Sequence, residues 1–161
     1  MSNELMDFLL EVPKPGEDEL KHFLREKGIK VKDVSDDGIY QAKDIDLLCW
    51  PPSAQPYSVE VKWDNRIADT QNLFWEIESY NKAGWGRYCE ADYLFYGDAQ
   101  NSIFYIFRVD LLRKYIEQNK DNFRRQRAFD FSKKDGTLRG ESIGLIVPLS
   151  EVSHLYSTIA V

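Results

Sequence analysis

The stretch from Ala42 to Arg66 reads AKDIDLLCWPPSAQPYSVEVKWDNR, and it decides the predicted fold. Two runs rich in apolar residues, each with charged residues at alternate positions, flank a turn that contains three prolines. Alternation of this kind is typical of β-strands, and prolines between two such runs mark a turn. The stretch therefore predicts a β-hairpin or a near-hairpin.

The charged side chains of each predicted strand should share a face, because side chains alternate between the two faces of a strand. Asp44 and Asp46 then lie together with Leu48, and Glu60 and Lys62 lie together with Ser58. The opposite faces carry Ile45, Leu47 and Cys49 on the first strand, and Val59, Val61 and Trp63 on the second. A strand with one solvated face gives the same pattern, and that interpretation stays open. Alternatively, acids and a lysine that converge from two strands can hold a divalent metal ion and a water molecule.

Length and composition are those of a globular protein. The 161 residues, 43% of them hydrophobic, predict a single domain over residues 1–161. No run approaches the length of a membrane span, and Met1–Leu10 carries acids rather than the basic start of a signal peptide. Cys49 and Cys89 lie far apart, and their spacing to the two histidines has no metal-ligand pattern. We therefore expect a cytoplasmic protein without a membrane partner.

The charge is distributed unevenly along the chain, which has a net charge of −6. Residues 113–139 contain nine Lys or Arg and four Asp or Glu, a net charge of +5, which leaves −11 for the rest. Within this segment the run 123–131, FRRQRAFDF, interleaves Arg124, Arg125 and Arg127 with phenylalanines, a composition that suits contact with nucleic acid. A solvated strand face is the alternative. Arg66, close to Lys62, is a second candidate phosphate contact.

The other segments predict an α/β fold with a mixed central sheet flanked by helices. The predicted helices are a short turn at Met6–Leu10, then Glu17–Lys27, a helix that Asp110 caps, and a final turn from Ser150 to Tyr156. The predicted strands outside the hairpin are 29–34, 92–96, 103–109, 123–131 and 144–149. The run Asp69–Ser79 fits a strand or a helix, and we favour the strand. As a strand, it places Glu76 and Glu78 on one face.

Asp46 followed by Glu60-Val61-Lys62 resembles the PD-(D/E)XK signature of the restriction-endonuclease-like nucleases. The helix at 17–27 is similar to the first helix of archaeal Holliday-junction resolvases in that superfamily. The run at 69–79, with Ala83-Gly84-Trp85-Gly86 and the strand at 91–96, looks like phage-encoded nuclease-like proteins, except that Gln71 stands where their run usually has glycine. The resemblance spans residues 17–117.

The resemblance implies a restriction-endonuclease-like fold and a set of site residues. Asp46, Glu60 and the backbone carbonyl of Val61 would bind Mg²⁺ or Mn²⁺, with Glu17 as a further ligand and Glu19 in reserve. Lys62 would orient the attacking water or stabilise the phosphate. Asp44, Glu76 and Glu78 would support the site from nearby, although for the last two we favour the alternative of solvated acids on an edge strand.

These observations predict a metal-dependent nuclease that hydrolyses phosphodiester bonds of DNA, of a phage or mobile-element type. One alternative is a catalytically silent nuclease-fold domain that binds DNA or a protein partner. Another is a nuclease specific for RNA or for branched junctions. The sequence is compatible with a homodimer.

Overall fold

The computed structural model describes residues 16–161, so the helical turn predicted at Met6–Leu10 lies outside the described residues. The helices are α2 (Glu17–Glu26), α3 (Gly38–Gln41), α4 (Ile67–Thr70), α5 (Trp85–Tyr88), α6 (Val109–Asn119), and the 3₁₀ segments η1 (Lys120–Asn122) and η2 (Leu149–Leu155). The strands are β1 (Lys30–Asp33), β2 (Leu47–Trp50), β3 (Tyr57–Asp64), β4 (Asn72–Ser79), β5 (Lys82–Ala83), β6 (Tyr93–Asp98), β7 (Ile103–Arg108), β8 (Arg124–Phe131), β9 (Leu138–Pro148) and β10 (Tyr156–Ala160).

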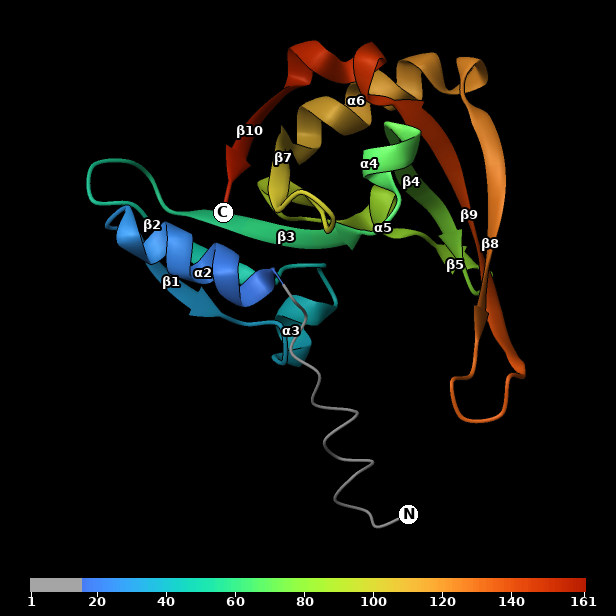
Figure 1. Ribbon diagram of the computed structural model, residues 1–161, viewed down its shortest axis with the longest axis horizontal. Helices are drawn as coiled ribbons and strands as arrows, with labels where there is room; N and C mark the ends of the chain where they lie inside the picture. Colours follow the sequence, from blue (N-terminus) through green and yellow to red (C-terminus); the bar gives the residue numbers. More distant parts are fainter. Residues whose placement is uncertain (1–15) are drawn as a thin grey trace.

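Six strands form a mixed sheet in the order β1-β2-β3-β6-β7-β10. Within residues 16–161, β3 and β6 make the parallel pair of this sheet, and all its other neighbours are antiparallel. β2 and β3 pair as the predicted hairpin, with Leu47 opposite Val59. The predicted α/β class with a mixed sheet is therefore confirmed, and β3 lies near the middle of the sheet (Figure 1).

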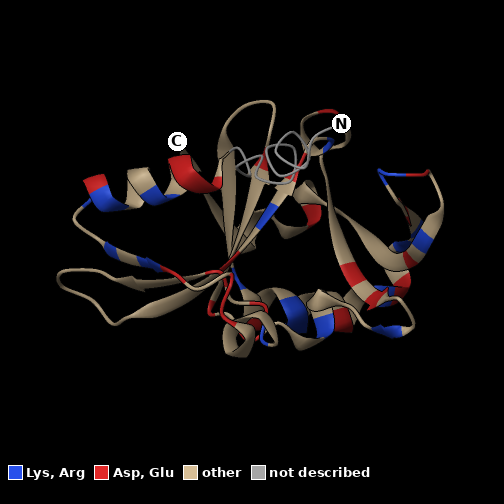
Figure 2. Cartoon of the chain, turned by 90° about the horizontal axis from the view of Figure 1, so that it is seen from below, with Lys and Arg blue, Asp and Glu red and all other residues tan. Residues whose placement is uncertain are grey.

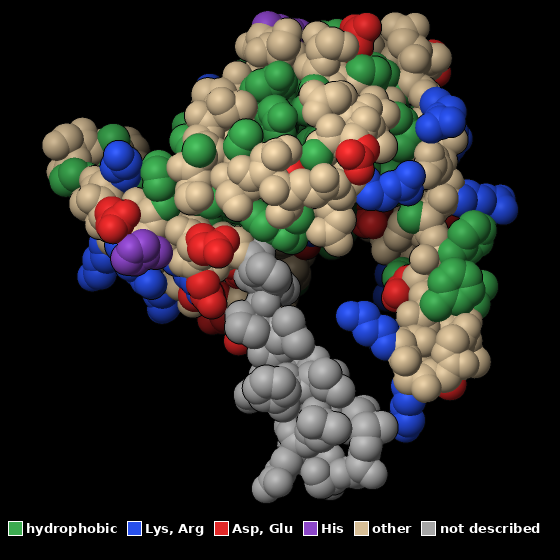
Figure 3. All heavy atoms as spheres, viewed as in Figure 1, with side chains coloured by type: hydrophobic (Ala, Val, Ile, Leu, Met, Phe, Trp, Pro, Cys, Tyr) green, Lys and Arg blue, Asp and Glu red, His purple; other side chains and the backbone are tan. Residues whose placement is uncertain are grey.

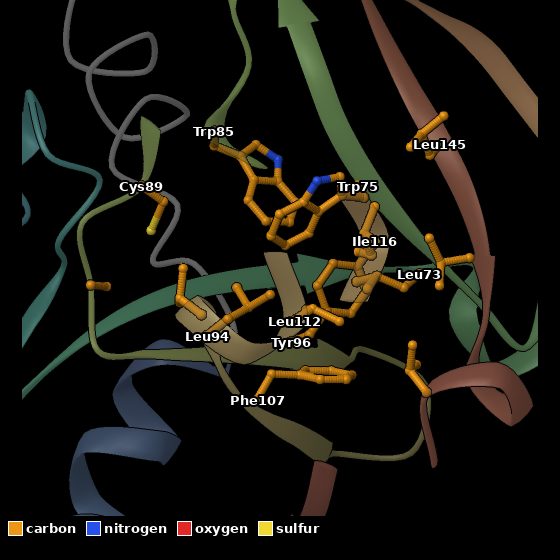
Figure 4. Packing of buried hydrophobic residues seen from close by; sticks show 14 of the residues in the cluster. Leu73, Trp75, Trp85, Cys89, Leu94, Tyr96, Phe107, Leu112, Ile116 and Leu145 are labelled. Atoms are coloured by element: carbon orange, nitrogen blue, oxygen red, sulfur yellow. The ribbon is translucent and has the colours of Figure 1, made fainter. Parts of the chain in front are cut away.

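Both faces of this sheet are covered, because its strands alternate apolar side chains between two separate cores. On one face, Leu20 and Leu24 of α2 pack against Val59 and its strand neighbours. On the other face, Leu94 and Phe107 pack against α6 and the second sheet. Figure 4 shows this larger core, in which side chains from helices and from both sheets meet. A strand buried on both faces holds its side chains in fixed directions, so β3 is a rigid support for charged residues.

Four strands form a second, antiparallel sheet in the order β5-β4-β9-β8, which the sequence did not distinguish from the first. β4 and β9 pair along most of their lengths, with Trp75 opposite Leu145, and both of these side chains are buried. β8 and β9 make a long hairpin that extends beyond the body of the molecule (Figure 1). Lys and Arg occur along this hairpin and at its turn (Figure 2).

Most predicted elements are confirmed, with three corrections. The helix at Glu17–Glu26 and the strand from Asn72 agree with the predictions, although α4 replaces the beginning of the run at 69–79. Asp110 lies in the first turn of α6 and is not its N-cap. The last predicted turn is followed by β10, which the sequence pattern did not reveal.

Candidate functional site

An acidic cleft of about 670 Å³ lies where α2 approaches the end of β3. Seven carboxylate residues and two lysines line it together with five uncharged residues. The acids are Glu17, Asp18, Asp33, Asp36, Asp44, Asp46 and Glu60, and the lysines are Lys21 and Lys62. Such an excess of carboxylates repels phosphate and attracts cations.

Glu60 and Lys62 lie at alternate positions of β3 and share a face, as the sequence predicted. The Glu60 carboxylate is almost fully buried, with the residue 3% exposed, and Oε1 forms an ion pair with Lys62 Nζ. The same ammonium lies 3.8 Å from Asp44 Oδ2 and 5.3 Å from the centre of the Trp85 ring. Lys62 is therefore held between two carboxylates and over an aromatic face.

Asp44 does not lie on a strand, which corrects the prediction. The short helix α3 ends in a Schellman motif, in which the Ile45 N–H donates to Tyr40 O (3.1 Å) and the Asp44 N–H to Gln41 O (3.1 Å). Asp44 occupies the left-handed position of this motif, with φ of 54°. Aspartate adopts this conformation more readily than most residues other than glycine. The helix end, rather than strand alternation, therefore directs Asp44 into the cleft.

Asp46 also precedes β2, although its backbone continues the pairing with β3. Its N–H donates to Val59 O (2.9 Å), and its carbonyl accepts from the Val34 N–H (2.8 Å). Its side-chain Oδ2 accepts from the Val61 N–H (2.8 Å). This hydrogen bond fixes the carboxylate beside the segment that carries Glu60 and Lys62. Ile45, Leu47 and Cys49 were predicted to share one face of a strand. Leu47 and Cys49 do pack together against α2, but Ile45 packs into the larger core on the opposite side, so the prediction of a common face is wrong.

The surroundings of the Asp44 carboxylate leave one of its oxygens without a donor. Tyr88 donates to Oδ1 (3.3 Å), and burial raises the pKa of Tyr88 to about 12, which keeps this donor protonated. Oδ2 is buried and has no hydrogen-bond partner among the described residues. Burial raises the pKa of the Asp44 carboxyl, against the attraction of Lys62. The cation nearest to Oδ2 is Lys62 Nζ at 3.8 Å, and a metal ion bound at closer range would satisfy this buried acceptor better.

Burial is the main cause of the shifted pKa of the Glu60 carboxyl. It raises the pKa of the Glu60 carboxyl to about 8; the charge of Lys62 opposes this shift, and the charges of Asp46 and Asp44 add to it. Burial alone acts to lower the pKa of Lys62, but the charges of Glu60 and Asp44 outweigh it, so this pKa is raised. Lys62 is thus a permanent cation at the centre of the site, and Glu60 titrates near neutral pH.

Glu17 lies at the first position of α2 and lines the same cleft, only 9% exposed. Glu19, the reserve candidate, is exposed and does not line the cleft. Glu76 and Glu78 also lie outside the cleft lining. Glu76 Oε1 accepts from the Trp85 N–H (3.3 Å), and a register shift between Glu76 and Glu78 interrupts the alternation of β4. The structure therefore gives Glu76 a role in positioning Trp85.

The carboxylates provide the hard oxygen atoms that Mg²⁺ and Mn²⁺ prefer. Within residues 16–161, no three His, Cys, Asp or Glu side chains are gathered into a ready-made metal-binding group. The Lys62 ammonium forms ion pairs with both Glu60 and Asp44. The donor set fits a hard divalent cation, provided that Lys62 moves from between the two carboxylates, because Asp44 Oδ2 has no hydrogen bond and only the 3.8 Å ion pair with Lys62.

A second cleft, of about 490 Å³, adjoins the acidic one and shares Lys62 and Trp63 with it. Its lining includes Arg66 and Arg124. β8 alternates, so Gln126 and Ala128 line this cleft with Arg124, whereas Arg125 and Arg127 do not. Of the four predicted nucleic-acid contacts, the structure therefore brings Arg66 and Arg124 to this second cleft.

Sequence reasoning missed Tyr88, and it assigned no role at the acidic cleft to Lys21 or Asp33. Lys21 Nζ bonds Asp33 Oδ2 at 2.8 Å, an ion pair that closes one side of the cleft. Tyr88 follows Trp85 by three residues in α5, a one-turn helix whose sequence gives no periodic signal. The sequence signal that could have pointed to this segment is the pair of glycines on either side of Trp85, because both pack directly on the backbone of Glu76.

Outside the site, both cysteines are buried and free. Within residues 16–161, none of the helices combines the length and the apolar character that a bilayer crossing requires. Comparisons of the chain with family models, with curated proteins and with solved structures gave no match.

The raised pKa of Glu60 predicts how stability depends on pH. The folded pKa of about 8 exceeds the ordinary value of 4.5, so Glu60 contributes stability below pH 4.5 that is lost as the pH rises to about 8. In the presence of EDTA, we expect the free energy of unfolding to fall over this window by about 1 kcal/mol or more relative to Glu60→Gln. Chemical denaturation of both proteins at a series of pH values measures the difference, in which other titrating groups cancel. A difference that stays constant between pH 5 and pH 8 would show that burial does not control Glu60.

Proposed function

We propose that the chain is a metal-dependent nuclease with a restriction-endonuclease-like fold that hydrolyses phosphodiester bonds of DNA. The observation that supports this most strongly is the position of Lys62. Its ammonium belongs to an acidic cleft suited to cations and to an adjoining cleft that contains Arg66 and Arg124. A phosphodiester group needs both environments, since its reaction requires cations and its polyanionic strand requires basic contacts.

The carboxylates of Asp44, Asp46 and Glu60 would hold the divalent cation, with Glu17 close by in the same cleft. When bound there, Mg²⁺ would lower the pKa of a water molecule and neutralise charge on the phosphate. With their charge balanced in this way, the carboxylates no longer need Lys62 as their counter-ion. The Lys62 ammonium can then stabilise the negative charge that develops on the phosphate in the transition state.

The protonation of Glu60 bears on the same chemistry. A carboxylate must be deprotonated to bind a metal ion, and burial favours its neutral form below about pH 8. Lys62, whose pKa is raised, stays charged across this range. The lysine therefore supplies a positive charge that does not vary with pH, whereas the capacity of the cleft for cations increases as the pH rises.

One observation favours the alternative of a catalytically silent domain that binds DNA. The ion pair of Lys62 with Glu60 fills the space between the carboxylates, and a domain without catalysis could use it as a permanent structural contact. The two functions differ in what Lys62 does when a cation is added. Plasmid, linear, single-stranded and branched DNA, and RNA, incubated with Mg²⁺ or with EDTA, separate a nuclease from a binder and indicate the preferred nucleic acid.

Replacing Lys62 by alanine should separate metal binding from hydrolysis. The three carboxylates remain, so cation binding should persist, whereas the hydrolysis rate should fall by about a hundredfold or more because transition-state charge is no longer stabilised. Cleavage rates and Mn²⁺ titrations of both proteins measure the two effects. Lys21→Ala is the matched control, since it removes a positive charge from the same cleft but leaves the Glu60 pair intact. Cleavage by Lys62→Ala at the wild-type rate would contradict the role of this lysine.

Arg124 should contribute more to DNA binding than Arg127, because Arg124 lines the cleft beside Lys62 and Arg127 does not. Arg124→Ser should weaken DNA binding and reduce the slope of log affinity against log salt by about 0.9 for each phosphate that the arginine neutralises. Arg127→Ser, on the same strand, should change both quantities less. Fluorescence anisotropy at several salt concentrations measures them. Equal effects of the two substitutions would place the DNA path along the hairpin instead of in the cleft.

A further inference from the structure

The second cleft has aromatic walls that are fixed in place. Phe74 packs directly on the backbone of β9, since a Cβ atom at Gly144 would lie 2.4 Å from its ring. Trp85 packs against Trp75 with ring centres 4.9 Å apart (Figure 4). Tyr96 is also held, because its hydroxyl donates to Asp64 (2.6 Å) and accepts from the Phe74 N–H (3.3 Å). Trp85 and Tyr96 are only 7% and 4% exposed, and the Lys62 ammonium lies over the Trp85 ring, so they support the wall from behind. The half-buried ring of Phe74 is the rigid aromatic face on which a flat ring system can stack without a large loss of entropy.

Three side-chain amides belong to the lining of the cleft. Asn65, Asn72 and Gln126 all line it. In the part of the chain that the structure describes, the side-chain amides of Asn65 and Asn72 make no hydrogen bond, and Gln126 accepts from Arg124 (3.1 Å). A carboxamide offers a donor and an acceptor side by side, which matches the edge of a nucleobase.

The charge of the cleft suits a nucleotide. Lys62, Arg66 and Arg124 contribute positive charge, and Asp64 is the one acid in the lining. The Asp64 carboxylate is already used, since it accepts from the N–H groups of Arg66 (2.6 Å) and Ile67 (3.1 Å) and from the Tyr96 hydroxyl. The volume of about 490 Å³ lies within the usual range of small-ligand sites.

We infer that this cleft binds the base of an unpaired nucleotide beside the scissile phosphate. The inference rests on the proposed function, because Lys62 connects the cleft to the reaction site. A base that stays stacked in a duplex exposes only its edges and cannot stack on Phe74, and flipping it out of the duplex costs its pairing and stacking, a cost that an unpaired base does not have. The substrate class is therefore a nucleic acid with an unpaired nucleotide at the cleavage site: a single strand, or a duplex with a single-stranded extension.

The test compares three labelled DNAs: a single strand, its blunt duplex, and that duplex with a single-stranded extension. Binding is measured by fluorescence anisotropy in Ca²⁺ buffer, and each sample is checked on a gel for intact DNA. Phe74→Leu should weaken binding of the two DNAs with unpaired bases by about tenfold, as expected when one base stack is removed. Asn72→Ala, which leaves the aromatic walls in place, should weaken the same two DNAs. Blunt-duplex binding should change little in both variants.

Phe129→Leu is the matched control, because Phe129 is 53% exposed on the β8–β9 hairpin, where basic and hydrophobic side chains lie next to one another (Figure 3). The inference is overturned if both cleft variants bind all three DNAs like the wild type, if they weaken the blunt duplex by the same factor, or if Phe129→Leu alone weakens binding. Absence of cleavage in Mg²⁺, with binding that still depends on Phe74 and Asn72, would contradict the nuclease proposal but retain the nucleotide site.

Discussion

The ammonium of Lys62 is the constraint on which the site depends. Glu60 is buried beside Asp44, and two carboxylates this close repel each other strongly in a medium of low polarity. Lys62 bonds one carboxylate and approaches the other, so the cluster is compatible with a stable fold. Removing one partner of a buried pair leaves an uncompensated charge, which is costly. The position of Lys62 is in turn fixed by β3, whose parallel pairing with β6 places it inside the sheet.

The same strand joins two clefts of opposite character. The loop between β1 and β2 and the first turn of α2 supply carboxylates to one cleft. The second sheet supplies Arg124 and Phe74 to the other. A chain with a net charge of −6 can thus attract a polyanion locally, because its cations and acids are separated at the place where both are needed. This separation of charge is the basis of the proposed nuclease function.

Glu60 and Lys62 could be predicted from the sequence, because two-residue alternation is a local property of a strand. Asp44 could not be placed correctly, since the end of α3 directs it and this four-residue helix has no periodic pattern. The arginines of β8 divide between the two faces of this strand. Which face meets the cleft depends on the pairing of β9 with β4, two strands that lie far apart along the chain. Glu76 was misplaced for a related reason: its carboxylate holds the backbone of Trp85, a contact that depends on how the chain returns after β5.

The central claim is that the acidic cleft binds a divalent cation through Asp46 and its neighbours. Thermal unfolding with Mn²⁺ and with EDTA tests it most directly, using the wild type, Asp46→Asn, and Asp36→Asn as a control from the same cleft. The account predicts that Mn²⁺ stabilises the wild type and Asp36→Asn, by about 2.7 kcal/mol at a hundredfold excess over the dissociation constant, and has little effect on Asp46→Asn. No shift in the wild type, or an equal shift in Asp46→Asn, would contradict it.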